Sequence, residues 1–206
     1  AYAQTSVSNI EQVDWTAKVS AYIGIPRVFG PPRWQFGGVI FGTIFPITTS
    51  PSAVYQARFY GYNLRAGYAF PLGKGWDLGL NLGYYLLTMF RSSSDELFGF
   101  RNASGPQIFP TLRKSLGRSH TLMTYFKFSP VITSGGFLSL DSREIATGLS
   151  WTWAWIPRFP MNTSFDFTMH DLATGTTSIS MRAVSLTAGF SYGTEPTGGF
   201  APPKVS

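Results

Sequence analysis

The most regular feature of this chain is an alternation of apolar and polar positions with a period of two residues. It is clearest in residues 13–25, where the odd positions are all apolar and the even positions are mostly polar or small. Successive side chains of a β-strand point to opposite faces, so this stretch predicts a strand with one apolar and one polar face.

The same period recurs in further stretches that are bounded by residues typical of turns. The predicted strands are 13–25, 34–46, 54–70, 76–90, 119–131, 143–156, 161–171 and 179–193. A strand that crosses a membrane needs roughly 9–11 residues, and each of these stretches is long enough. The best-defined pair is 54–70 and 76–90, which a tight turn at 71–75 joins into a hairpin.

The two faces of the predicted strands differ in side-chain size as well as in polarity. Gly, Ala, Ser, Thr and Asn dominate the polar face, whereas Trp, Phe and Leu crowd the apolar face. Small polar residues suit a narrow lumen, and large apolar residues suit contact with lipid. We therefore expect an all-β fold, a transmembrane antiparallel up-and-down β-barrel of about eight strands. A soluble barrel or sandwich, with its apolar face inward, is the alternative.

Composition supports the membrane interpretation. Of the 206 residues, 17% are aromatic and only 13% are charged, against about 25% charged in ordinary soluble domains. No apolar run reaches 18 residues, which excludes a transmembrane helix. The net charge is +6, but no run of Lys or Arg exceeds two residues. We expect contact with outer-membrane lipid or lipopolysaccharide, and no nucleic-acid partner.

The chain divides into three predicted parts. Residues 1–12 are an N-terminal extension, and residues 1–4 resemble the end of a secretory signal with its cleavage site. The barrel occupies 13–193 and includes one long connection at 91–118. Residues 194–206 are a Pro- and Gly-rich tail. These features predict a protein of the bacterial outer membrane, exported by a cleaved signal peptide.

This pattern resembles the small outer-membrane β-barrel superfamily, which includes the OmpA transmembrane domain and OmpX-like proteins. The resemblance covers about 13–193 and rests on the strand pattern, not on a signature motif. Members commonly end in a strand with an aromatic final residue, which the barrel-assembly machinery reads. Residues 187–192 look like part of such a signal, although the chain continues to Ser206. The resemblance implies an architecture and no particular protein.

Two groups of residues have predicted places in such a barrel. Charged residues on the polar faces should form a satisfied network in the lumen, because buried charges need partners. They are Asp14, Lys18, Arg65, Asp77, Lys127 and Asp166. Tryptophans near strand ends should lie at the membrane interfaces. They are Trp15, Trp34, Trp76, Trp151, Trp153 and Trp155.

The connection 91–118 and the tail are the predicted contact region for another envelope protein. If both chain ends face the periplasm, an eight-stranded barrel places this long connection on the same side as the tail. The candidate contact residues are Phe98, Phe100, Arg101, Phe109, Arg113, Lys114 and Phe200.

Candidate chemistry is sparse. The only histidines lie in Ser119-His120 and His170-Asp171, and neither spacing brings together a nucleophile, a base and an orienting group. We expect no catalytic residues, cofactor or metal site. The favoured hypothesis is a non-enzymatic structural or anchoring component of a cell-envelope assembly. A barrel enzyme that acts on lipid A or peptides, and a narrow pore, stay open as alternatives.

Overall fold

Every regular element of the computed structural model, in the part of the chain that it describes, is a β-strand. The described residues are 2–7, 10–26, 34–44, 47–48, 56–91, 102–117, 119–130, 132–134, 137–139, 142–154, 156, 159–174 and 177–190. For some of them, including 2–15, only the backbone is described. Within these ranges, no helix is long and apolar enough to cross a membrane.

The strands pair with one another in antiparallel fashion. In chain order they are β1 (Tyr2–Val7), β2 (Ile10–Trp15), β3 (Lys18–Pro26), β4 (Trp34–Thr43), β5 (Ile47–Thr48), β6 (Gln56–Gly73), β7 (Trp76–Arg91), β8 (Asn102–Leu116), β9 (His120–Ser129), β10 (Ile132–Ser134), β11 (Phe137–Ser139), β12 (Arg143–Trp153), β13 (Met161–Thr174) and β14 (Thr177–Phe190). The predicted all-β, antiparallel up-and-down architecture is confirmed.

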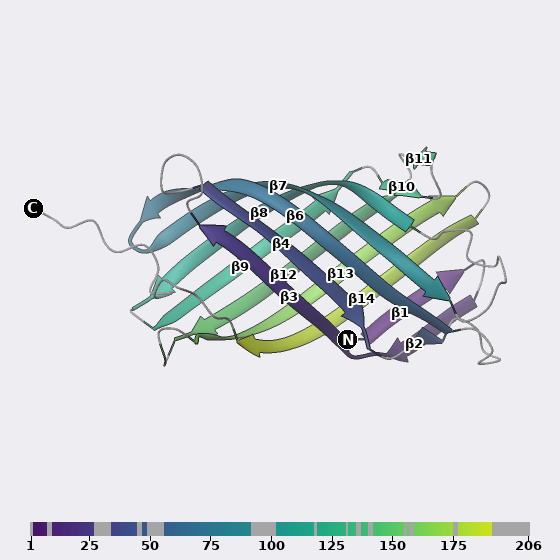
Figure 1. Ribbon diagram of the computed structural model, residues 1–206, viewed down its shortest axis with the longest axis horizontal. Helices are drawn as coiled ribbons and strands as arrows, with labels where there is room; N and C mark the ends of the chain where they lie inside the picture. The colour runs from purple at the N-terminus through teal and green to yellow at the C-terminus, as the bar shows by residue number, and fades with distance from the viewer. Residues whose placement is uncertain are drawn as a thin grey trace, which may run out of the picture.

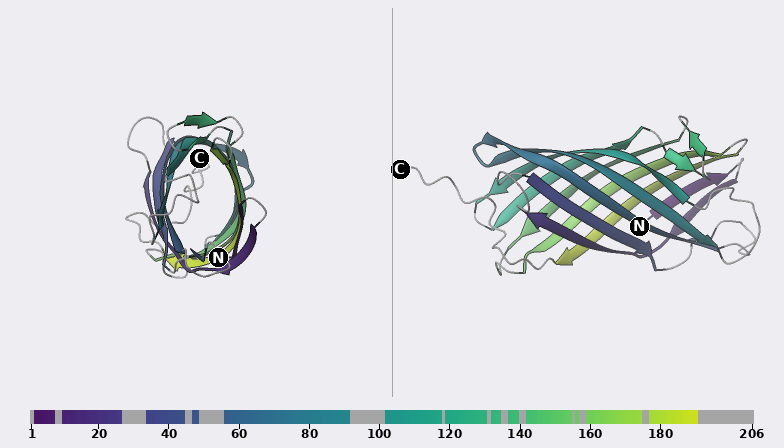
Figure 2. Two further views of the ribbon diagram at one scale, coloured as in Figure 1. Left: turned by 90° about the vertical axis from the view of Figure 1, so that its right-hand side faces the viewer. Right: turned by 45° about the horizontal axis from the view of Figure 1, so that its top comes forward.

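The sheet curls round until its two ends meet in one segment of the chain. The hydrogen-bonded order is β2-β1-β14-β13-β12-β9-β8-β7-β6-β4-β3. Its two ends, β2 and β3, follow each other in the chain with only Thr16 and Ala17 between them. If β2 and β3 count as one strand, ten strands surround the lumen. The left view of Figure 2 shows these strands arranged round an oval.

The two ends of the barrel differ in their connections. At one end, called here the turn end, β6 meets β7 through the turn at 74–75 and β8 meets β9 through 117–119. At the opposite end, the loop end, the longer connections 92–101 and 130–142 follow β7 and β9. β14 finishes at the turn end. The strands are tilted against the long axis of the barrel (Figure 1).

The two-residue alternation decides which side chains face outward. In β6, Tyr62 and Leu64 are 42% and 61% exposed, whereas Gly61 is buried. Other large apolar side chains exposed on the outer wall include Val19, Ile23, Ile40, Leu82, Leu149, Phe165 and Leu186. A wall of closed strands with apolar side chains outward satisfies its own backbone hydrogen bonds, which a lipid environment requires.

The prediction of one long connection over 91–118 is wrong, because Asn102–Leu116 form β8, which pairs with β7 and β9. Pro106 and Pro110 conceal this strand in the sequence, since a proline normally argues against an interior strand. The structure accommodates them within the ladder to β7, opposite Tyr84 and Leu80.

The predicted N-terminal extension is also wrong, because Tyr2–Val7 form β1 and β2 begins at Ile10. β1 joins β14 on one side to β2 on the other and so closes the sheet. The two additional strands, β1 and β8, raise the expected eight strands to ten, and the number stays even.

The additional strand β8 also changes the end of the barrel at which each connection lies. The connections at 26–33 and 71–75 lie at the turn end, whereas those at 132–142 and 172–178 lie at the loop end. β7 ends at the loop end and β14 ends at the turn end. The expectation that the connection after β7 and the C-terminal tail share one side is therefore wrong. The tail itself, 194–206, lies outside the described residues.

Candidate functional site: a polar network across the lumen

Glu144 is the centre of a polar cluster on the inner face of the barrel. Its side chain is 2% exposed, and Lys127 on the neighbouring strand β9 places its ammonium 2.5 Å from Glu144 Oε1. Gln107 donates a hydrogen bond to Glu144 Oε2 at 2.6 Å, and the Ser129 hydroxyl lies 3.4 Å from the same oxygen. On the other side, His170 Nε2 is 3.8 Å from Oε1. A buried carboxylate is tolerated only with partners of this kind.

The cluster extends to strands that are not neighbours in the sheet. Gln107 belongs to β8 and Glu144 to β12, so their hydrogen bond passes over β9. Gln107 also accepts a hydrogen bond from the Asn63 side-chain amide of β6, which passes over β7. These side chains therefore reach across the concave inner surface and tie together β6, β8, β9, β12 and β13.

A second tier lies nearer the turn end and is centred on Asp166. The Tyr125 hydroxyl donates to Asp166 Oδ1 at 2.5 Å, and Ser164 donates to Oδ2 at 2.9 Å. Tyr125 is on β9 and Asp166 on β13, so the tyrosine ring must cross β12. It crosses at Gly148, which pairs with both residues in the sheet register. A Cβ at Gly148 would collide with Tyr125 and Asp166; the glycine makes room for the contact.

Aromatic rings and one guanidinium continue this tier round the lumen. The Phe109 and Tyr125 rings stack with centroids 5.1 Å apart. The Arg65 guanidinium lies 4.6 Å from the Phe109 centroid and 5.0 Å from that of Tyr22. Cation–π contacts of this kind are favourable, and more so when the groups are desolvated. Together with Asp166, these residues form a continuous series of contacts from β3 through β6, β8 and β9 to β13.

The structure also places the other charged residues that the sequence assigns to the lumen. The Lys18 ammonium lies 5.3 Å from the Phe41 centroid and within electrostatic range of Asp166 and Glu144. Asp77 pairs with Arg113 at 3.6 Å near the turn end, away from the two tiers. For Asp14 only the backbone, in β2, is described.

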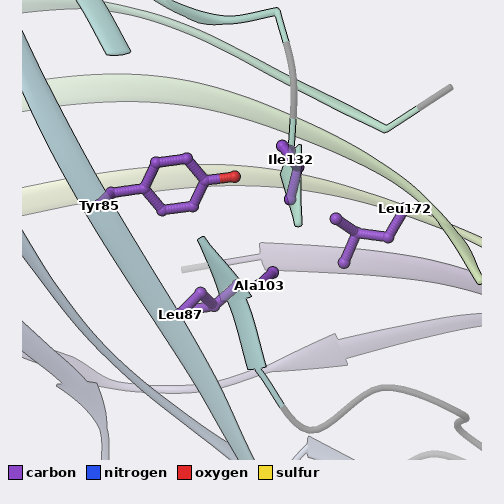
Figure 3. Close-up of a cluster of buried hydrophobic side chains, with 5 residues drawn as sticks. All are labelled: Tyr85, Leu87, Ala103, Ile132 and Leu172. Carbon is purple, nitrogen blue, oxygen red and sulfur yellow. The ribbon is translucent and has the colours of Figure 1, made fainter. Parts of the chain in front are cut away.

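An apolar layer covers the Glu144 cluster on its loop-end side. Ile132 of β10 is fully buried there, and its strand pairs with β8. The layer consists of Tyr85, Leu87, Ala103, Ile132 and Leu172. Figure 3 shows these side chains converging from β7, β8, β10 and β13. Phe41, Phe59 and Met181 pack against them from β4, β6 and β14. The layer lies between the polar tiers and the loop-end mouth.

The tryptophans whose side chains are described gather at the turn end. Trp34 and Trp76 begin β4 and β7, Trp151 lies near the end of β12, and all three are 39–49% exposed. Trp151 and Trp153 pack edge to face at 5.4 Å. Only the backbone of Trp15 is described, and Trp155 lies outside the described residues.

Three of the predicted partner contacts lie in β8. Phe109 faces the lumen and is 9% exposed, Arg113 pairs with Asp77, and Lys114 lies on the outer wall beside Trp76. Their prediction as members of one long connection is therefore wrong. Phe98, Phe100, Arg101 and Phe200 lie outside the described residues.

The two histidines lie at opposite ends of the barrel. His120 begins β9 at the turn end, and its ring is 5.9 Å from that of Trp151. His170 lies beside Glu144 near the loop end, whereas its neighbour Asp171 pairs with Arg143 at 3.0 Å. The structure thus gives Asp166 and His170, which share a strand face, different partners. In the described parts of the chain, no group of three His, Asp or Glu is placed to hold a metal ion.

Sequence reasoning did not single out Glu144, Gln107, Asn63 or Tyr125 as network members. The sequence does contain a signal for Glu144, because in a two-residue alternation it falls on the same inner face as Ala146 and Gly148. No local signal identifies its partners, since they lie up to 37 residues away in the chain.

Comparison with solved structures agrees with this fold. Neither a protein-family model nor a curated protein matches the chain. The outer-membrane protease OmpT from Escherichia coli superposes with a TM-score of 0.60 at 14% identity, over 93% of this chain and 86% of that one. Two further structures are more distant. The KdgM porin has a TM-score of 0.37 at 6% identity, over 89% of this chain and 95% of that one. The toluene transporter TodX of Pseudomonas putida has a TM-score of 0.38 at 9% identity, over 92% of this chain and 68% of that one. The chain has the fold of the bacterial outer-membrane β-barrels.

Proposed function

We propose that this chain is an integral outer-membrane barrel that serves as a structural or anchoring component of the cell envelope, with a lumen closed to solutes. The observation that carries the proposal is the network of Glu144 and Asp166, which ties together the neighbouring strands β8, β9, β12 and β13 along the inner wall. A structural barrel needs such internal ties, whereas a diffusion pore needs an open polar path.

Strand number alone does not close this barrel. Barrel diameter grows with strand number, and ten strands enclose a wider lumen than eight. Closure therefore depends on side chains that project inward from the wall, such as Tyr125 and Gln107, and on the apolar layer around Ile132. Apolar constrictions block ions because water does not fill them stably.

The unequal ends support an orientation for the proposed barrel. Outer-membrane barrels have short periplasmic turns and longer external loops. By this rule the turn end faces the periplasm and the loop end faces outward. The segment that follows β14 then leaves on the periplasmic side, where an anchoring contact with another envelope protein would form.

Two measurements on the refolded chain test the proposal. Unboiled samples should migrate differently from boiled samples on an SDS gel, because a closed barrel resists the detergent. The same material in a planar bilayer should show no discrete conductance. Regular single-channel steps would replace the anchoring proposal with the narrow pore, and a change in lipid A mass or cleavage of peptides would replace it with the enzyme.

The anchoring role itself is tested in cells. Removal of residues 194–206, with the barrel 2–190 left intact, should abolish a cross-link to one specific envelope protein without preventing insertion. Replacement of 92–101 at the opposite end is the matched control and should leave that cross-link in place. Insertion with an unchanged pattern of cross-links after the tail is removed would contradict the anchoring role.

A further inference from the structure

Trp76 and Lys114 on the outer wall, together with Lys74 in the adjoining turn, form a basic surface at the turn end. Trp76 begins β7, and Lys114 lies directly opposite it in β8. The Lys114 ammonium is 4.9 Å from the centroid of the Trp76 ring and donates to the Lys74 backbone carbonyl at 2.7 Å. We call Lys74, Trp76 and Lys114 the basic rim.

The backbone of the basic rim is unusual. Gly73, Lys74 and Gly75 all have positive φ, at 84°, 50° and 78°. Such left-handed backbone is normal for glycine, and a two-residue hairpin turn prefers Asn or Gly at its first position. A lysine there is disfavoured, so its presence favours a role for the side chain. The Lys74 carbonyl holds Lys114 beside the turn.

The charge of the rim is not neutralised by the nearby acid. Asp77 faces inward, where it pairs with Arg113 at 3.6 Å, while Lys114 faces outward with Trp76. Among residues whose side chains are described, Asp77 is the only acid at the turn end; Glu144, Asp166 and Asp171 lie further toward the loop end. The positive charge on the outer wall therefore faces the surroundings of the barrel at the turn end.

The neighbouring outer wall is apolar. Leu116, two residues beyond Lys114, is 48% exposed, and Trp76 itself is 39% exposed. Leu122 lies opposite Lys114 on the next strand, β9. A ligand for this surface therefore needs an anionic group beside a hydrocarbon chain, which is the chemistry of a membrane lipid with a phosphate headgroup.

We propose that the basic rim binds the phosphate of an anionic phospholipid, whose acyl chains lie along the wall formed by β7, β8 and β9. This inference rests on the membrane location proposed above. Tryptophan prefers the headgroup level of a bilayer, and lysines close to an anionic surface attract its charge. The rim thereby fixes the depth of the turn end in its leaflet.

Lipid selection by the refolded chain tests the proposal. The protein, in a neutral detergent, is given equal amounts of phosphatidylglycerol and phosphatidylcholine with the same acyl chains, and native mass spectrometry counts the bound lipids. Phosphatidylglycerol should predominate on the wild-type barrel. Lys74→Gln and Lys114→Gln should each weaken its binding by roughly fivefold, the equivalent of about 1 kcal/mol per lysine near an anionic surface.

Arg182→Gln is the matched control, because Arg182 is an exposed cation of β14 outside the rim, and it should leave lipid binding unchanged. Equal phosphatidylglycerol binding by the Lys74→Gln/Lys114→Gln variant and the wild type would overturn the inference. Displacement of the lipid by equimolar inorganic phosphate would also overturn it and indicate a free-anion site. The gel shift of each sample reports the closed barrel independently, so a folded barrel without lipid preference contradicts only the basic rim.

Discussion

Removal of the Glu144 carboxylate should destabilise the barrel more than any change in an exposed charge. At an effective dielectric constant of about 20, unit charges 2.5 Å apart attract by roughly 6–7 kcal/mol before desolvation is subtracted. Glu144→Ala leaves the Lys127 ammonium, 23% exposed, without this partner and also removes the acceptor of Gln107. Truncation of one member of a buried pair typically costs 3–5 kcal/mol, and we expect about that loss in the free energy of unfolding.

A double-mutant cycle isolates the contact between Glu144 and Lys127. The free energy of unfolding is measured by urea titration of the refolded barrel for the two single methionine variants and the double variant. Because two apolar side chains leave no uncompensated charge, the double variant should be more stable than either single variant. The pair Arg143 and Asp171, which joins β12 to β13 next to Glu144, provides a control, with side chains 57% and 27% exposed. Its coupling should not exceed about 1 kcal/mol.

The outcome that refutes this reasoning is equal coupling in the two pairs. It would mean that water reaches Glu144 as freely as it reaches the exposed pair Arg143 and Asp171. The lumen would then be open at the level of the network, and the closed-lumen proposal would fail with it.

Four further substitutions test other parts of the structure. Gly148→Val should displace Tyr125 from Asp166 and cost about 2 kcal/mol or more in the free energy of unfolding, because the new side chain occupies the space of the ring. An unchanged urea midpoint would show that the Tyr125 ring does not cross β12 at Gly148. Leu149→Arg, in the middle of β12, should cost about 2–4 kcal/mol in a bilayer, whereas Leu116→Arg near the turn end should cost about 0–1 kcal/mol, although the two leucines are 49% and 48% exposed. Equal costs, measured by refolding into vesicles, would place both side chains at one depth. Ile132→Ala should lower the free energy of unfolding by about 2–5 kcal/mol, because Ile132 is fully buried in the apolar layer; a change below 1 kcal/mol would show that β10 does not hold that layer together.

The alternation in the sequence was sufficient to identify the fold class and the two faces of most strands. Tyr62 and Leu64 on one side of β6, and Asn63 and Arg65 on the other, follow from a period of two alone. Where prolines interrupted the apolar pattern, as at Pro106 and Pro110, the same reasoning missed a whole strand. The local pattern was weak there, and pairing with β7 and β9 formed the strand.

By itself, the sequence determined that this chain builds strands with a small polar face and a large apolar face, because side-chain direction in a strand depends only on position parity. Only the tertiary structure decided which polar residues meet. Gln107 and Glu144, or Tyr125 and Asp166, become partners through strand order and register, and a shift of one residue would turn each strand's side chains to the opposite face. Register is set jointly by every pairing round the barrel, and no local stretch of sequence contains that information.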